Sequence, residues 1–222
     1  MEYSFCDDVG GKQNVCEVDY FPYIIDETKC YNNNMRVEDI LHFSPKYKTP
    51  YLDLDNGDEL INAFVDRVEE FYLKPAEKLN NEFEAFAKGV LILTAIDFIG
   101  EFFIRTESSN RIKKFCSELS SIKGLKNEAL KKGQVKIIND DYRNGLIHEG
   151  RIKNMGQFFY ATEDLISVGE GVSMINPTTL LNETRSIFYK YVGKINNSKD
   201  EMFHFKNKFK QHFENEILAL GD

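Results

Sequence analysis

The apolar side chains of this 222-residue chain recur at helical spacing from about Asn56 almost to the C-terminus, and this repeat limits the possible folds more than any other feature. The widest apolar stripe runs from Glu82 to Arg105, which predicts the most buried helix. Pro75 is expected to end or kink the helix before it, and Gly150 to end a later one. The same spacing predicts further helices at about 56–75, 108–124, 135–149, 176–192 and 198–220. We therefore expect a mainly α-helical bundle.

Two regions lack this spacing. Residues 1–55 are rich in Tyr, Asp, Asn and Pro, and their strand candidates, Val15–Tyr20 and Tyr23–Ile25, predict an irregular, partly β segment. Residues 151–175 contain three short β-like runs separated by glycines and acidic residues, which predicts a small meander after a helix. We therefore expect an acidic N-terminal segment at 1–55 and a helical domain at 56–222, with the meander at about 151–175.

Charge and composition narrow the functional classes. The net charge is −8, and residues 1–60, with thirteen acidic and five basic side chains, carry all of it. An acidic protein binds nucleic acid poorly through its overall field, so any nucleic-acid activity needs a local site. No apolar run is long enough for a membrane helix, and the first residues do not resemble a signal peptide, so we expect a cytoplasmic protein. The cysteines match no zinc-ligand spacing and are expected to be free thiols: Cys6, Cys16, Cys30 and Cys116.

One string, DDYRNGLIHEGRIK at residues 140–153, gathers the side chains best suited to chemistry. A purely structural interpretation makes Arg143 an ion-pair residue, with Asp140 as one partner, and makes His148 a histidine near a helix end. Gly145 argues against it, because a glycine inside a helix costs about 1 kcal/mol relative to alanine. It permits the close approach of a partner helix or a phosphate. Asn144 adds amide donors and an acceptor directly after the arginine.

This string resembles the HEPN family signature, in which an arginine and a polar residue are followed, after a few residues, by a histidine. Arg143, Asn144 and His148 occupy these three places, and the matching helical context covers roughly Asp58 to Lys153. The resemblance implies a HEPN-type helical bundle and RNA cleavage without a metal ion, in a cleft at a homodimer interface. It also implies a toxin or phage-defence effector, with RNA, a second copy and an antitoxin or regulatory protein as partners, and no cofactor.

The side chains suit this chemistry independently. His148 can act as a general base or acid, Arg143 can stabilise a phosphorane, and Asn144 can orient the phosphate or the histidine. In an α-helix, five residues turn through about 500°, which leaves Arg143 and His148 about 140° apart. Either the helix therefore ends at His148, or two subunits supply the two side chains. We favour the dimer.

Weaker candidates surround the motif. Basic side chains could guide the RNA backbone, although a solvated charged face is the simpler interpretation; the candidates are Lys132, Lys136, Arg151 and Lys153. A divalent metal site is a further alternative, and its ligands would be Asp140, Asp141, His148 and Glu149. Their spacing matches no standard metal-ligand pattern, so we expect no metal. A competing function is a non-catalytic HEPN module that binds RNA, a nucleotide or a protein, which the acidic net charge supports.

Overall fold

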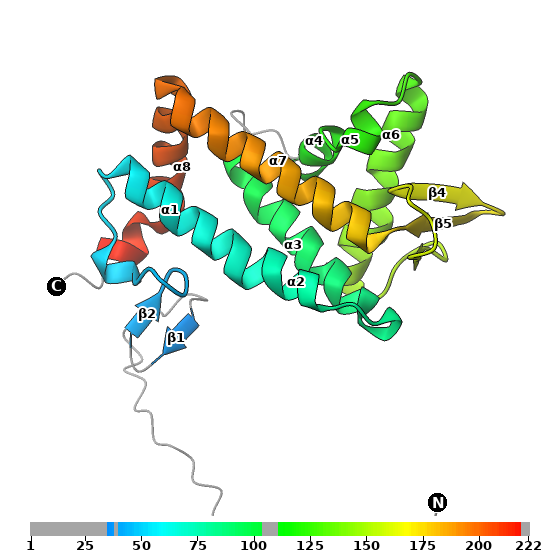
Figure 1. Ribbon diagram of the computed structural model, residues 1–222, viewed down its shortest axis with the longest axis horizontal. Helices are drawn as coiled ribbons and strands as arrows, with labels where there is room; N and C mark the ends of the chain where they lie inside the picture. Colours follow the sequence, from blue (N-terminus) through cyan, green and yellow to red (C-terminus); the bar gives the residue numbers. More distant parts are fainter. Residues whose placement is uncertain (1–34, 38–39, 104–110, 219–222) are drawn as a thin grey trace, which may run out of the picture. The chain divides into compact units, whose positions relative to one another are not determined.

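The computed structural model describes residues 35–37, 40–103 and 111–218. The strand candidates at 15–25 and three of the four cysteines lie outside these residues. The first described elements are two short antiparallel strands, β1 (Met35–Val37) and β2 (Ile40–His42), followed by a 3-10 turn, η1 (Thr49–Tyr51) (Figure 1). Phe43 and Leu52 are buried in the core that the helices share, so this part of the predicted N-terminal segment packs with the helical domain.

The first long helix begins where the sequence predicts. α1 (Gly57–Val68) is capped by Asn56, whose side-chain oxygen accepts a hydrogen bond from the Glu59 amide at 3.2 Å. The helix then widens into a π-helical segment, η2 (Glu69–Leu73), and continues as α2 (Lys74–Lys78). Pro75 therefore does not end it. The wider turn before Pro75 gives the proline ring more room beside the preceding carbonyl groups, which reduces the usual clash.

α3 (Ala85–Phe103) is the central helix, as its wide apolar stripe predicts. It follows a 3-10 turn, η3 (Glu82–Glu84), and packs against α2, α4, α7 and α8. Its Phe102 ring lies 4.6 Å from Phe64 of α1, which in turn lies 5.4 Å from Phe205 of α8. These aromatic contacts join three helices into one core.

No helix among the described residues is long and apolar enough to cross a membrane.

The helix that carries the motif is longer than predicted and is mostly not a regular α-helix. After α4 (Arg111–Ser117) and α5 (Ser120–Lys123), α6 (Glu128–Lys136) begins at Asn127, whose side chain caps the Ala129 and Leu130 amides. It continues as two π-helical segments, η4 (Ile137–Arg143) and η5 (Gly145–Glu149). Gly150 ends it in the left-handed conformation, with φ of 65°, which confirms the predicted stop.

The three predicted strands are present, but they do not form a meander. β4 (Ile166–Gly169) and β5 (Val172–Ile175) form an antiparallel hairpin, whereas β3 (Gln157–Phe158) runs parallel to β5 at its other edge. Tyr142 explains this order, because its buried hydroxyl lies within hydrogen-bond distance of the Gln157 and Ser173 carbonyls, one on each strand. The motif helix thereby holds β3 beside β5.

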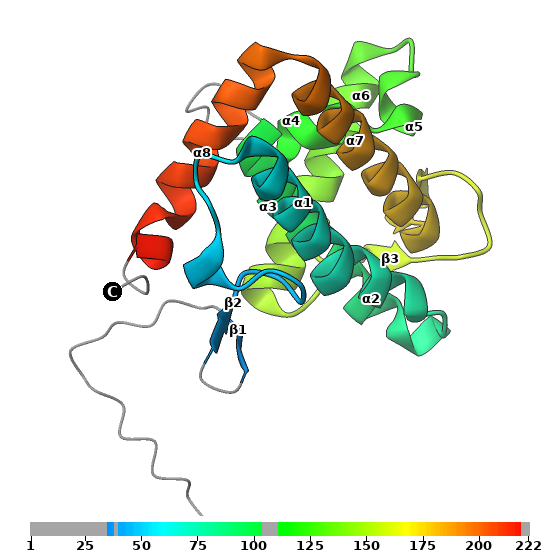
Figure 2. The ribbon, with the colours of Figure 1, turned by 60° about the vertical axis from the view of Figure 1, so that its left-hand side comes forward.

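Two long helices complete the fold. α7 (Pro177–Asn197) starts after its cap, Asn176, and α8 (Lys199–Leu218) follows after Ser198 (Figure 2). The Ser198 hydroxyl accepts a hydrogen bond from the Glu201 amide at 3.3 Å. Both helices bury their apolar faces against α3. The fold is mainly α, with a small three-stranded sheet, as the sequence predicts.

Candidate active site

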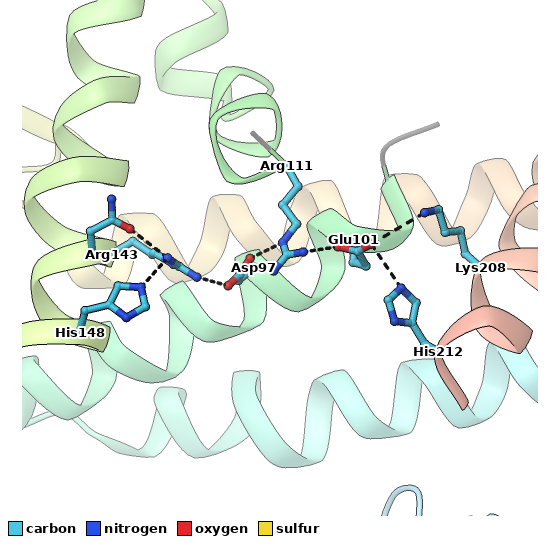
Figure 3. Close-up of polar contacts among 8 residues, drawn as sticks. Asp97, Glu101, Arg111, Arg143, His148, Lys208 and His212 are labelled. Atoms are coloured by element: carbon cyan, nitrogen blue, oxygen red, sulfur yellow. Dashed lines mark hydrogen bonds and ion pairs between the residues drawn. The ribbon is translucent and has the colours of Figure 1, made fainter. Parts of the chain in front are cut away.

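Arg143 and His148 meet within a single chain. Nη1 of Arg143 lies 3.0 Å from Nε2 of His148 (Figure 3). Arg143 ends η4 and His148 lies in η5, and hydrogen bonds in a π-helix join residues five apart. Positions i and i+5 therefore share a face, which they do not in an α-helix. The expected separation of about 140° is wrong for this segment, and the geometry no longer requires a second subunit.

The contact assigns a role to one nitrogen of the imidazole. A guanidinium has donors only, so a hydrogen bond between these two atoms uses Nε2 of His148 as the acceptor. The His148 side chain is exposed to solvent. A nitrogen that accepts this hydrogen bond has the lone pair that a general base requires.

Arg143 is held in place from its other side by Asp97 of α3. Nη2 donates to Oδ2 of Asp97 at 2.5 Å, and the two side chains are only 18% and 19% exposed. Nη1 donates to the Asn144 side-chain oxygen at 2.9 Å, so Asn144 orients the arginine. The buried Nε of Arg143 has no hydrogen-bond partner among the described residues. These contacts fix the plane of the guanidinium before any ligand arrives.

Asp97 belongs to a larger charged network between α3, α4 and α8. Its Oδ1 accepts from Nε of Arg111 at 2.6 Å, and Arg111 also binds Glu101. Burial alone would raise the pKa of the Asp97 carboxyl, but hydrogen bonds and charge from Arg111 and Arg143 outweigh it and lower that pKa. The other Glu101 oxygen lies 3.3 Å from His212 and 3.8 Å from Nζ of Lys208 (Figure 3).

The sequence offered one signal for this network. Asp97 and Glu101 lie four residues apart inside an otherwise apolar helix, so they share a face, and a carboxylate inside an apolar helix needs a partner. That signal indicates buried ion pairs but does not name the partners. Arg111 and Arg143 lie 14 and 46 residues from Asp97 in the sequence, and only the packing of α4 and η4 against α3 brings them to it.

Gly145 has a different role from the one expected. The residues after the helix, 151–153, fold back over it, and the Arg151 amide donates to the Gly145 carbonyl at 3.2 Å. A Cβ atom at Gly145 would lie 2.4 Å from the Arg151 carbonyl oxygen. The close approach that this glycine permits is therefore made by the chain itself, and neither a partner helix nor a phosphate is needed to explain it.

The weaker basic candidates are not brought to the Arg143–His148 pair by any described contact. Arg151 and Lys153 both pair with Glu149, at 2.8 and 2.5 Å, and Lys136 pairs with Asp140 at 3.1 Å. Lys132 is exposed. Their proposed role along an RNA backbone stays a prediction.

The residues of the metal alternative also have separate partners. Asp141 accepts a hydrogen bond from Asn154 at 2.8 Å, whereas Glu149 and Asp140 pair with lysines and His148 faces Arg143. Within residues 35–37, 40–103 and 111–218, no group of three His, Cys, Asp or Glu side chains is placed to hold a metal ion.

Comparison with known proteins adds no relative. No protein-family model, curated protein or solved structure matches this chain. The similarity to the HEPN family therefore depends on the Arg143–Asn144–His148 string and its helical surroundings.

Proposed function

We propose that this protein is a metal-independent endoribonuclease of the HEPN type. The observation that carries the proposal is the contact between Nη1 of Arg143 and Nε2 of His148. In this contact a cation that can bind a phosphate and an imidazole nitrogen that can accept a proton are one hydrogen bond apart, and the imidazole is exposed to solvent. RNA supplies the matching pair of groups, a phosphodiester and a neighbouring 2′-hydroxyl.

The reaction follows from these groups. A scissile phosphate that accepts hydrogen bonds from the Arg143 guanidinium replaces His148 as its partner, which frees the Nε2 lone pair. Nε2 then takes the proton of the 2′-hydroxyl as the 2′-oxygen bonds to phosphorus. The bond from phosphorus to the 5′-oxygen breaks, and that oxygen takes a proton from a general acid. The products are a 2′,3′-cyclic phosphate and a free 5′-hydroxyl. Arg143 stabilises the negative charge that develops on the phosphorane during the reaction.

A homodimer remains part of the proposal for a chemical reason. The attacking and leaving oxygens lie on opposite sides of the phosphorus in an in-line displacement, so one imidazole cannot easily serve both. A second copy of the chain would bring a second His148 to the groove, one as base and one as acid. A defence effector or toxin, controlled by an antitoxin or another regulatory protein, is the biological role that we propose for such an activity.

RNA cleavage in EDTA tests the proposal directly. The wild type is expected to cleave total RNA with metal chelated and to leave 2′,3′-cyclic phosphate ends, whereas Arg143→Ala and His148→Ala lose activity by about 100-fold or more. Arg185→Ala is the matched control, because Arg185 also pairs with two carboxylates, Glu69 and Glu77, but lies elsewhere on the fold. It is expected to retain activity. Inertness of the wild type at micromolar concentration would refute the nuclease.

A non-catalytic HEPN module is the second candidate function. The observation that favours it is that Asp97 already neutralises Arg143, which weakens the attraction of the guanidinium for a phosphate. Such a module would bind RNA, a nucleotide or a protein without cleaving RNA. Binding of an RNA oligonucleotide that survives intact, and that Arg143→Ala weakens, would select this function.

A further inference from the structure

A pocket of about 330 Å³ lies on the side of Asp97 that faces α8. Tyr72, Phe98 and Phe213 provide aromatic walls, and the Tyr72 and Phe98 rings stack at 6.1 Å between centroids. Tyr72 and Phe98 are partly exposed. The volume falls at the lower end of the range of about 300–1,000 Å³ that small-ligand pockets occupy. An aromatic pocket of this size suits a flat ring system.

The polar edge of the pocket consists of two carboxylates and two basic side chains. Asp97 and Glu101 face Arg111 and His212 around the cavity. The Glu101 oxygen that faces His212 and Lys208 has only long contacts, 3.3 and 3.8 Å, so it can accept hydrogen bonds from a ligand without losing a short ion pair. The pocket therefore offers aromatic faces together with a carboxylate acceptor.

The pocket and the proposed reaction centre, which is the Arg143–His148 pair, share one side chain. Asp97 uses Oδ1 to bind Arg111 at the pocket and Oδ2 to bind Arg143 at the centre (Figure 3). The cations of this network, Arg111, Arg143 and Lys208, outnumber its two carboxylates even with both histidines neutral. This network therefore has one more cation than carboxylates, although the chain as a whole has a net charge of −8, and the surplus cation can attract a phosphate group.

We infer that this pocket holds the base of the nucleotide next to the scissile phosphate, and that it prefers guanine; this inference rests on the proposed function. Guanine presents two adjacent N–H donors, N1–H and the exocyclic amino group, and one of them can donate to the Glu101 oxygen that has only long contacts while the other Glu101 oxygen keeps Arg111. Uracil presents carbonyl oxygens on both sides of its single N–H, and these would face the Glu101 and Asp97 oxygens. Aromatic stacking holds bases of any kind, so the carboxylate edge supplies the selectivity.

Mononucleotide binding tests the pocket without any cleavage. Titration calorimetry with the full chain at low salt measures the two affinities. We expect guanosine 5′-monophosphate to bind about tenfold more tightly than uridine 5′-monophosphate, because one additional hydrogen bond to a charged group changes the dissociation constant by about this factor. Inorganic phosphate should bind more weakly than either. Equal affinities for the two nucleotides, or for phosphate and the guanine nucleotide, would overturn the inference.

Substitutions distinguish the contribution of the carboxylate edge of the pocket from that of its aromatic walls. Glu101→Gln is expected to lower affinity for the guanine nucleotide about tenfold but not to lower affinity for the uracil nucleotide, because the uracil carbonyl oxygens then no longer face a charged carboxylate at this position. Tyr72→Ala, at a partly exposed position, should weaken both nucleotides by about tenfold through lost stacking. Glu118→Gln is the matched control, since Glu118 pairs with Lys123 away from the pocket. Unchanged binding in the Tyr72 variant, or equal losses of both nucleotides in a folded Glu101 variant, would contradict the assignment.

A cleavage experiment distinguishes an RNA base from a free nucleotide. Oligonucleotides with a single guanine in an otherwise uridine strand should be cut next to that guanine, and guanosine 5′-monophosphate should inhibit the cut near its own dissociation constant. Cleavage that ignores guanine while the nucleotide still binds would refute the substrate role and identify a free nucleotide as the ligand. Nucleotide binding without any cleavage would refute the ribonuclease and leave a guanine-nucleotide pocket.

Discussion

Asp97→Asn is the most informative single substitution, because Asp97 joins Arg143 to the rest of the fold. The Asn oxygen can keep one of the two arginine hydrogen bonds, but its amide nitrogen then faces the other arginine as a second donor. Hydrogen bonds to charged groups contribute about 1.5–3 kcal/mol each, and exposed ion pairs about 0–1 kcal/mol. Arg111 is 47% exposed and Arg143 only 18%. We therefore expect the variant to lose about 2 kcal/mol of unfolding free energy at pH 7, mostly at Arg143.

The loss should depend on pH in a defined direction. The pKa of Asp97 in the folded state is below its usual value of 3.8, so its ionised form contributes stability that is fully present above that value. This contribution disappears as pH falls through the lowered folded pKa. The difference in unfolding free energy between wild type and Asp97→Asn should therefore be constant from pH 7 to about pH 5 and shrink below pH 4.

Urea titrations followed by circular dichroism at pH 7, 5, 4 and 3.5 measure this difference. Asp141→Asn is the matched control, since Asp141 accepts one exposed hydrogen bond from Asn154, and its effect should stay within about 0.5 kcal/mol. A difference between wild type and Asp97→Asn that is below 0.5 kcal/mol at pH 7, or that persists undiminished at pH 3.5, would refute the ionic anchoring of Arg143.

Three further predictions concern packing and burial. Gly145→Ala should destabilise the fold by about 1–3 kcal/mol, because its Cβ would meet a carbonyl oxygen at 2.4 Å. Gly133→Ala, with open space around it in α6, should instead stabilise the fold by up to about 1 kcal/mol. Thermal melts that rank the two variants in the opposite order would contradict this prediction. Tyr142→Phe should cost about 2 kcal/mol in urea titrations, because it leaves buried backbone groups unpaired, and a neutral effect would show that the hydroxyl does not join η4 to the sheet. Burial raises the pKa of the Cys116 thiol to about 12, so peptide mapping after iodoacetamide treatment at pH 8 should find Cys116 unmodified in the folded protein and alkylated in urea.

Local signals in the sequence predicted most of the helices. Asn56 and Asn176 cap helices that begin where the sequence predicts, and Gly150 ends the motif helix as expected, because each acts through neighbouring backbone atoms. The strand order was not predictable in this way. The parallel pairing of β3 with β5 depends on where the Tyr142 hydroxyl lies, which is a property of the packed fold and not of the local sequence.

The geometry of the candidate site was not predictable from the sequence, and the catalytic role of its residues stays a prediction. Apolar periodicity does not distinguish an α-helix from a short π-helical segment, so the sequence predicts the α-helical separation of about 140° for Arg143 and His148. Asp97 was visible only as an acid that interrupts an apolar helix. Its pairing with Arg143 spans 46 residues, and no local rule assigns partners over such a separation.

The π-helical segment has a consequence for how such sites vary between proteins. A π-turn corresponds to one extra residue in a regular helix. Deleting one residue between Asn144 and His148 would restore ordinary turns and leave the arginine and the histidine four apart, a spacing that also places both on one side of the axis. The same pair of groups can thus be built at either of two spacings, and a sequence pattern that permits only one spacing would miss the chains that use the other.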